Sequence, residues 1–172
     1  MAAAVAVLVV GLVVVLLLIG QLGVGSSTDD SPAPTADAVG GLERARADLD
    51  LPLVVPVGLP SNWQANSFQT VEPGGTGQPA VVRAGWLTAD GRFIALVQST
   101  ADPADLVATE IAAPGSAGKG TTTAGGVDWQ IYPGVRNEVV WVRAAGSLSQ
   151  LITGSASESD FRVMAAAVAA GS

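Results

Sequence analysis

The first 28 residues contain no ionisable side chain, and no other feature of the sequence constrains the chain as strongly. Residues 2–20 form an uninterrupted apolar stretch. At about 1.5 Å per residue, a helix of some 20 residues covers the roughly 30 Å hydrocarbon core of a bilayer. We therefore expect residues 1–25 to form a transmembrane helix that anchors the chain in a membrane.

A cleaved signal peptide is the main alternative for this segment, because signal peptides are also N-terminal and apolar. Their apolar region usually has about 7–15 residues, follows basic residues and precedes a small-residue cleavage site. Here the run is longer and no Lys or Arg precedes it, which favours an uncleaved anchor. The first charges after it, Asp29 and Asp30, are acidic. We expect a single pass through the cytoplasmic membrane, with the N-terminus inside and the C-terminal domain outside.

The rest of the chain has the composition of a linker followed by one domain. Residues 26–36 are rich in small polar residues, acids and prolines, which is typical of a flexible linker. Residues 37–172 are enough for one extracytoplasmic domain with its own core. The net charge of −7 disfavours nucleic-acid binding. The chain has no His and no Cys, so it lacks the commonest general base, the soft nucleophile and the usual zinc ligands. We expect no enzyme activity, no cofactor and no metal.

The hydrophobic pattern of residues 37–172 predicts an α+β fold. Capping residues at Asp37, Asp102 and Ser157 begin three expected helices. Asp90-Gly91 between two β-rich runs predicts a hairpin, and residues 114–120 are expected to form a loop. Tight connections favour antiparallel neighbours, so we expect an antiparallel sheet of about six strands with helices packed on one face. The β-rich segments are 53–57, 62–68, 80–88, 92–99, 127–132, 138–143 and 148–153.

Several motifs imitate catalytic or phosphate sites without the context those sites need. The glycine-rich segment 114–121 leaves a helix and enters a strand, whereas a phosphate-binding loop does the reverse. Acidic pairs occur at Asp48/Asp50, Asp102/Asp105 and Glu158/Asp160, where helix capping and solvation explain them. A hydrolase that uses carboxylates alone is therefore the least favoured hypothesis.

The tryptophans are the remaining candidates for recognition. Each of the four lies in a different expected strand, and most should be core anchors. Trp129 and Trp141 carry a polar N–H and could line a groove, and Tyr132 follows close behind. We take Trp129, Tyr132 and Trp141 as candidate contacts to a ligand or a partner.

The sequence resembles a family of actinobacterial membrane-anchored proteins, domain of unknown function 4245. The resemblance rests on the N-terminal span and on residues 57–60, Trp63, 85–86, 90–91, 96–99, 126–133 and 154–157. It implies a single-span protein with a small domain outside the cytoplasmic membrane, and it brings no activity with it. A basic stretch expected before the span is absent here, which suggests a start site upstream of Met1. Residues 141–169 are also similar to the end of extracytoplasmic lipid-carrier and anti-sigma sensor domains.

Two functions of different classes follow as hypotheses. The first is a non-catalytic envelope domain that is held at the membrane by its N-terminal helix and binds or organises a protein partner. The second is a carrier or sensor of an apolar envelope ligand. A roomy apolar cleft between sheet and helices would favour the second hypothesis over the first.

Overall fold

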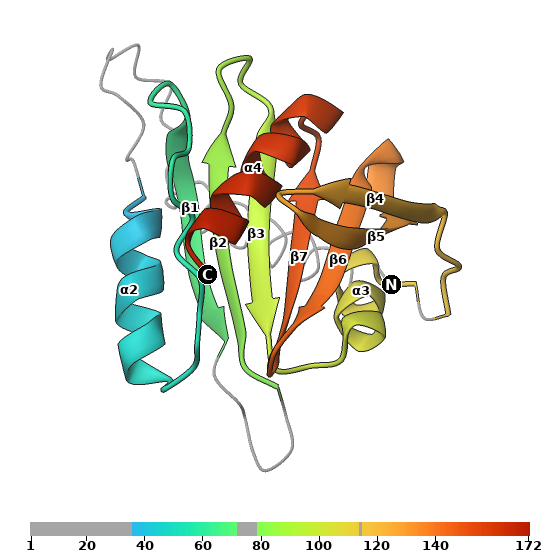
Figure 1. Ribbon diagram of the computed structural model, residues 1–172, viewed down its shortest axis with the longest axis horizontal. Coiled ribbons are helices and arrows are strands. Elements are labelled where there is room, and N and C mark those ends of the chain that lie inside the picture. The colour runs from blue at the N-terminus through green and yellow to red at the C-terminus, as the bar shows by residue number, and fades with distance from the viewer. Residues whose placement is uncertain (1–35, 72–78, 114) are drawn as a thin grey trace, which may run out of the picture. The chain divides into compact units, whose positions relative to one another are not determined.

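The computed structural model describes residues 36–71, 79–113 and 115–172 (Figure 1). The expected anchor at residues 1–25 lies outside the described residues, as does the expected linker except for Ala36. No helix in the described part of the chain combines the length and the apolar character needed to span a membrane.

The described residues form three α-helices and seven strands. In chain order these are α2 (Ala38–Asp48), β1 (Gln64–Val71), β2 (Val81–Leu87), β3 (Phe93–Ser99), α3 (Pro103–Ile111), β4 (Gly120–Ala124), β5 (Val127–Pro133), a short 3-10 helix (Val135–Asn137), β6 (Val139–Ala145), β7 (Leu148–Gly154) and α4 (Glu158–Ala170).

All seven strands belong to one antiparallel sheet of order β1-β2-β3-β7-β6-β5-β4. Two meanders make up this sheet, β1–β2–β3 and β4–β5–β6–β7, and α3 connects them along the chain. The last strand pairs with β3, which closes the two meanders into a single surface. The α+β class and the antiparallel sheet are thus confirmed, with seven strands where about six were expected.

One strand assignment from the sequence is wrong, and one strand of the structure was not expected. Residues 53–57 form an extended segment without a strand partner, because other groups bind their backbone. The Gln98 side chain bonds both the N–H and the C=O of Val54, each at 2.8 Å, and the N–H of Val57 donates to Ala167 O at 3.0 Å. Conversely, β4 forms at Gly120–Ala124, whereas the sequence predicted a loop over residues 114–120 and no strand between that loop and residue 127.

The helices lie on both faces of the sheet, not on one face as the sequence suggested. Successive residues of a strand point to opposite faces. On β6, Trp141 belongs to the core cluster with α2 and α4, while its neighbours Val140 and Val142 belong to a second cluster with α3. In Figure 1, α4 crosses in front of the sheet and α2 lies beside β1. The sequence could not assign α3 a face, because its single apolar stripe suits either one.

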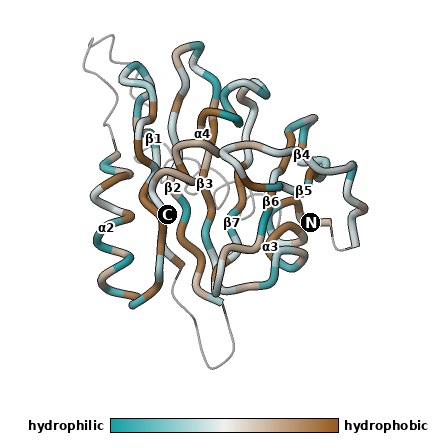
Figure 2. The backbone as a smooth tube through the Cα atoms, in the orientation of Figure 1, coloured by the Kyte–Doolittle hydropathy of each residue, from teal (hydrophilic) through white to brown (hydrophobic). Residues whose placement is uncertain are grey.

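Local sequence explains where the helices begin. The Asp37 side chain accepts from Gly40 N–H at 2.9 Å, and α4 begins with a reciprocal capping box between Ser157 and Asp160. Pro103 occupies the first turn of α3, where its missing N–H costs nothing. Along α2, hydrophobic and hydrophilic residues alternate (Figure 2), and Leu42 is buried in the core. All three expected helix starts are confirmed.

Candidate functional site

The three candidate contact residues do not lie together. Trp129 and Trp141 point to the α4 face of the sheet, whereas Tyr132 packs against the α3 cluster on the other face. Trp129 is 0% exposed and its Nε1 donates to Ala124 O at 3.2 Å, so its polar group is satisfied inside the core. Trp141 is 2% exposed, yet it forms one wall of a surface slot. Trp141 is therefore the candidate whose ring forms a wall of the slot.

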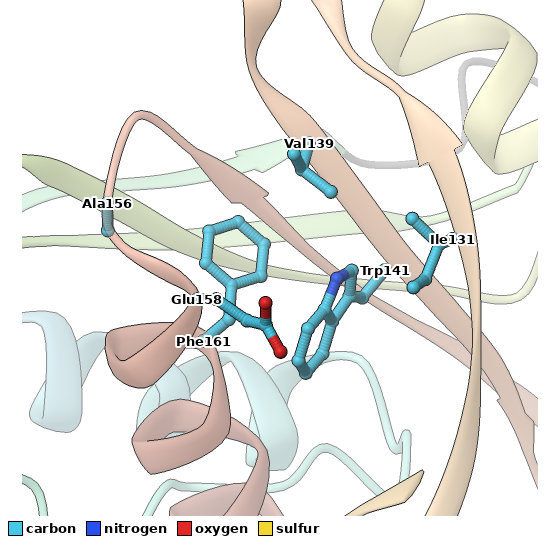
Figure 3. Close-up of a pocket in the computed structure, with 6 residues that line it drawn as sticks. All are labelled: Ile131, Val139, Trp141, Ala156, Glu158 and Phe161. Carbon is cyan, nitrogen blue, oxygen red and sulfur yellow. The ribbon is translucent and has the colours of Figure 1, made fainter. Parts of the chain in front are cut away.

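The slot lies where the N-terminal end of α4 meets strands β5 and β6. It has a volume of about 260 Å³ and is mostly apolar. The rings of Trp141 and Phe161 are 5.3 Å apart between centroids and tilted by 60°, an edge-to-face type of contact. Figure 3 shows these two rings on one side and Val139 and Ile131 on the other. Six residues line the slot: Ile131, Val139, Trp141, Ala156, Glu158 and Phe161.

Glu158 gives the slot one charged group, and Arg162 already neutralises it. The Arg162 guanidinium donates to Glu158 Oε1 at 2.7 and 3.2 Å. The same guanidinium donates to Thr123 O and to Thr122 Oγ1 on β4, and its carbon lies 5.9 Å from the centroid of the Trp141 ring. Arg162 thus ties α4 to the sheet edge and covers Trp141. The chemistry that remains free in the slot is apolar.

In the described structure, the side chains of α2, α4 and the sheet face that they cover pack against one another in one cluster. The side chains that face each other there, among them Leu42, Ile152 and Met164, are fully buried in one cluster. The slot volume is below the roughly 300–1,000 Å³ of pockets that enclose a drug-sized ligand. It is the size of a receptacle for one side chain.

A second, more polar hollow adjoins the slot and shares Val139 and Ala156 with it. Arg92, Arg136 and Glu138 contribute its charges, and its volume is about 270 Å³. Arg92 donates to the backbone oxygen of Ser155 at 3.2 Å, which fixes the loop between β7 and α4. The apolar slot therefore has a polar rim, an arrangement common at protein interfaces.

A family model for proteins of unknown function, DUF4245, matches residues 1–168. The chain belongs to the DUF4245 family. No curated protein and no solved structure matches this DUF4245 chain significantly. The expected family is thus confirmed, and the family carries no activity or site to compare with the slot.

Most residues of the slot in this DUF4245 protein were not singled out from the sequence. Glu158 stands out in the sequence only as a member of an acidic pair, and Ile131 and Val139 only as parts of the expected strands 127–132 and 138–143. The alternation of β5 and β6 does place Ile131, Val139 and Trp141 on one face, given their register. The sequence does not reveal where α4 packs on the sheet, and α4 supplies the other wall of the slot.

The acidic pairs noted in the sequence serve helix ends or face solvent. Asp160 completes the capping box of α4, and Asp102 stands at the N-cap position of α3 with Asp105 in its first turn. Across residues 36–71, 79–113 and 115–172, no three acidic side chains gather closely enough to hold a metal ion. The absence of enzyme activity stays a prediction.

Proposed function

We propose that this protein is a non-catalytic, membrane-anchored domain of the cell envelope that binds a protein partner, and that the slot beside Trp141 receives one apolar side chain of that partner. The observation that carries this proposal is the slot itself, which has two aromatic walls, an apolar interior and the volume of a single side chain. Interfaces gain most of their affinity from a few such anchors in desolvated pockets.

The surroundings of the slot also support a protein partner. Val139 lines the slot and is an exposed large apolar residue, and Arg92 and Arg136 line the adjoining polar hollow. The hydrogen bonds of Arg162 to Glu158 and to Thr123 O connect α4 to β4 beside the slot, which would lower the cost of ordering the slot on binding. An apolar centre with a polar rim is the usual anatomy of such an interface.

A carrier of an apolar envelope ligand is the weaker proposal. A lipid acyl chain needs an enclosed apolar volume, and the space between α4 and the sheet is occupied by the packed side chains of the core cluster. If this function holds, organic extraction of the purified full chain will release a stoichiometric lipid detectable by mass spectrometry. An extract without bound lipid would leave the partner-binding proposal as the stronger one.

The setting in the cytoplasmic membrane rests on the apolar run at residues 2–20. We infer that the chain is a single-pass protein with residues 37–172 outside. Protease added to intact spheroplasts should then digest that domain, and sodium carbonate should leave the chain in the membrane fraction. Protection from the protease, or release by carbonate, would contradict this setting.

Site-specific photocrosslinking in intact cells tests the partner proposal. A benzophenone amino acid at Val139, which is 39% exposed, should crosslink to a partner in the full-length chain. The matched control is the same label at Val163, an equally exposed valine (36%) on α4 that does not line the slot. Ala156→Trp should fill the slot and abolish the crosslink from position 139.

Equal crosslinking from the two positions, or a crosslink that Ala156→Trp leaves unchanged, would refute the role of the slot. Circular dichroism of the variant controls for folding, because Ala156 lies in the loop between β7 and α4 rather than in an element.

A further inference from the structure

A row of side chains crosses the α4 face of the sheet and becomes polar at its centre. Gln98 on β3 pairs with Gln150 on β7, and Gln150 pairs in turn with Arg143 on β6. Gln130 on β5 pairs with Val142 on β6, so the antiparallel register places Trp129 opposite Arg143, and Trp129 continues the row. Gln98 and Gln150 are fully buried, while Arg143 is half-buried.

The guanidinium of Arg143 is held in place by its neighbours in this row. Its Nε donates to Gln150 Oε1 at 2.9 Å, and its carbon lies 5.2 Å from the centroid of the Trp129 ring. Its two terminal nitrogens donate to no residue in the part of the chain that the structure describes. The hydrogen bond and the stacking therefore orient a guanidinium whose terminal nitrogens have no acceptor among the described residues.

This arginine borders a hollow of about 640 Å³, separate from the slot beside Trp141. Arg46 on α2 supplies a second guanidinium, and no Asp or Glu is among the lining residues. Ser172 also lines the hollow, and neither arginine belongs to an ion pair among the described residues. The charged side chains that line the hollow are therefore both basic, in a chain of net charge −7.

We propose that this hollow binds a phosphate group, with Arg143 as the bidentate donor and Arg46 as the second positive charge. The planar fork of arginine matches the oxygens of a phosphate and forms two parallel hydrogen bonds with them. The two positive charges of the guanidinium groups match the double negative charge of a phosphate monoester, whereas a carboxylate carries only one negative charge.

Burial supports this assignment. Desolvation lowers the pKa of Arg143, because the charged form loses water without gaining a counter-ion. A bound anion would supply that counter-ion and offset the cost. Pro52, Leu53 and Val54 line another part of the hollow, and their apolar groups would contact the carbon body of a phosphate ester. The phosphate could come from a lipid headgroup or from a free phosphate compound.

Calorimetric titration of the full chain tests the proposal. The chain is kept in micelles of an uncharged maltoside in chloride buffer, and the probes are inorganic phosphate, glycerol 3-phosphate and acetate. We expect saturable binding of at least one phosphate probe and binding of acetate at least tenfold weaker. Tighter binding of glycerol 3-phosphate points to a headgroup as the source, and tighter binding of inorganic phosphate to a free anion. Acetate that binds as tightly as either phosphate, or no saturable binding at all, overturns the proposal.

Charge variants locate the site. Arg143→Gln should weaken phosphate binding at least tenfold, and Arg143→Lys should also weaken it because lysine lacks the fork. Lys119→Gln removes the same charge outside the hollow and should leave the affinity within twofold of the wild type. If Arg143→Gln fails to fold, the exposed Arg46→Gln replaces it, with an expected loss of at least threefold. Unchanged affinity in a folded variant at position 143 or 46 overturns the assignment.

Discussion

At the scale of single residues, Gln98 shows how a buried polar side chain can replace a strand. Its amide donates to the C=O of Val54 and accepts from the N–H of the same residue, both at 2.8 Å. A neighbouring strand would offer the same pair of groups to an antiparallel partner. The segment around Val54 is therefore attached to the sheet face through one amide, and no buried side-chain nitrogen or oxygen among the described residues lacks a hydrogen bond.

Gln98→Met tests this attachment. The substitution keeps an unbranched side chain but leaves two buried backbone groups of Val54 without partners. At about 1–3 kcal/mol for each orphaned group, we expect a loss of about 2–6 kcal/mol in the free energy of unfolding. Urea denaturation measures it, and Gln69→Met on the exposed side of β1 is the control, with an expected change within about 0.5 kcal/mol. Equal effects of the two changes would rule out the special role of Gln98.

Asp37 allows a prediction about pH. The N–H of Gly40, first, and the Arg44 guanidinium hold the pKa of the Asp37 carboxyl below its usual value of 3.8. Because the pKa is lower in the folded chain, the contribution of this carboxylate is complete above the usual value and is lost as the pH falls through the lowered one. An NMR titration of Asp37 should have its midpoint below 3.8. Arg44→Gln should raise that midpoint, and a wild-type midpoint at or above 3.8 would contradict the capping contact.

At the scale of elements, sequence patterns located structure where the bonding partner is local and failed where it is distant. The β2–β3 hairpin follows from Asp90-Gly91, whose glycine has φ +70. The β4–β5 hairpin carried an equally good signal, because Gly125-Gly126 has two positive φ angles after a run of threonines. That cue could have found β4. By contrast, residues 53–57 looked like a strand because nothing in their own sequence reveals that Gln98 binds their backbone.

The pairing of β3 with β7 depends on Gly154, and this gives an element-scale prediction. Gly154 has φ +143, and a Cβ at this position would lie 2.2 Å from the backbone oxygen of Phe93. Gly154→Ala should therefore cost about 3 kcal/mol or more, since backbone must move as well as adopt a strained angle. Gly91→Ala, where a Cβ meets no atom within 4 Å, isolates the conformational cost and should lose only about 1 kcal/mol. Thermal unfolding measures both, and similar losses would show that the contact with Phe93 does not matter.

At the scale of the whole domain, one sheet carries two separate apolar clusters. The larger cluster joins α2 and α4 to one face, and the smaller one joins α3 to the other through Leu106, Val107 and Ile111. The slot and the Arg143 hollow both lie on the face of the larger cluster. The sequence predicted the helices, most of the strands and the tryptophan-rich core. It could not predict which face of the sheet each helix covers, because that depends on contacts between distant segments, and the positions of the hollows follow from it.

The two clusters should contribute independently to one cooperative transition. Leu106→Ala on α3 and Met164→Ala on α4 remove fully buried side chains and should each cost about 2–5 kcal/mol. Val163→Ala, at an exposed position of α4, should stay within about 0.5 kcal/mol. Because Leu106 and Met164 belong to different clusters on opposite faces, the losses in the double variant should add to within about 0.5 kcal/mol.

Urea unfolding followed by tryptophan fluorescence and by circular dichroism should give coincident curves, since every strand belongs to the same sheet. A loss below about 1 kcal/mol for Leu106→Ala would mean that α3 does not cover the second face, and separate transitions would mean that the two meanders fold as independent units.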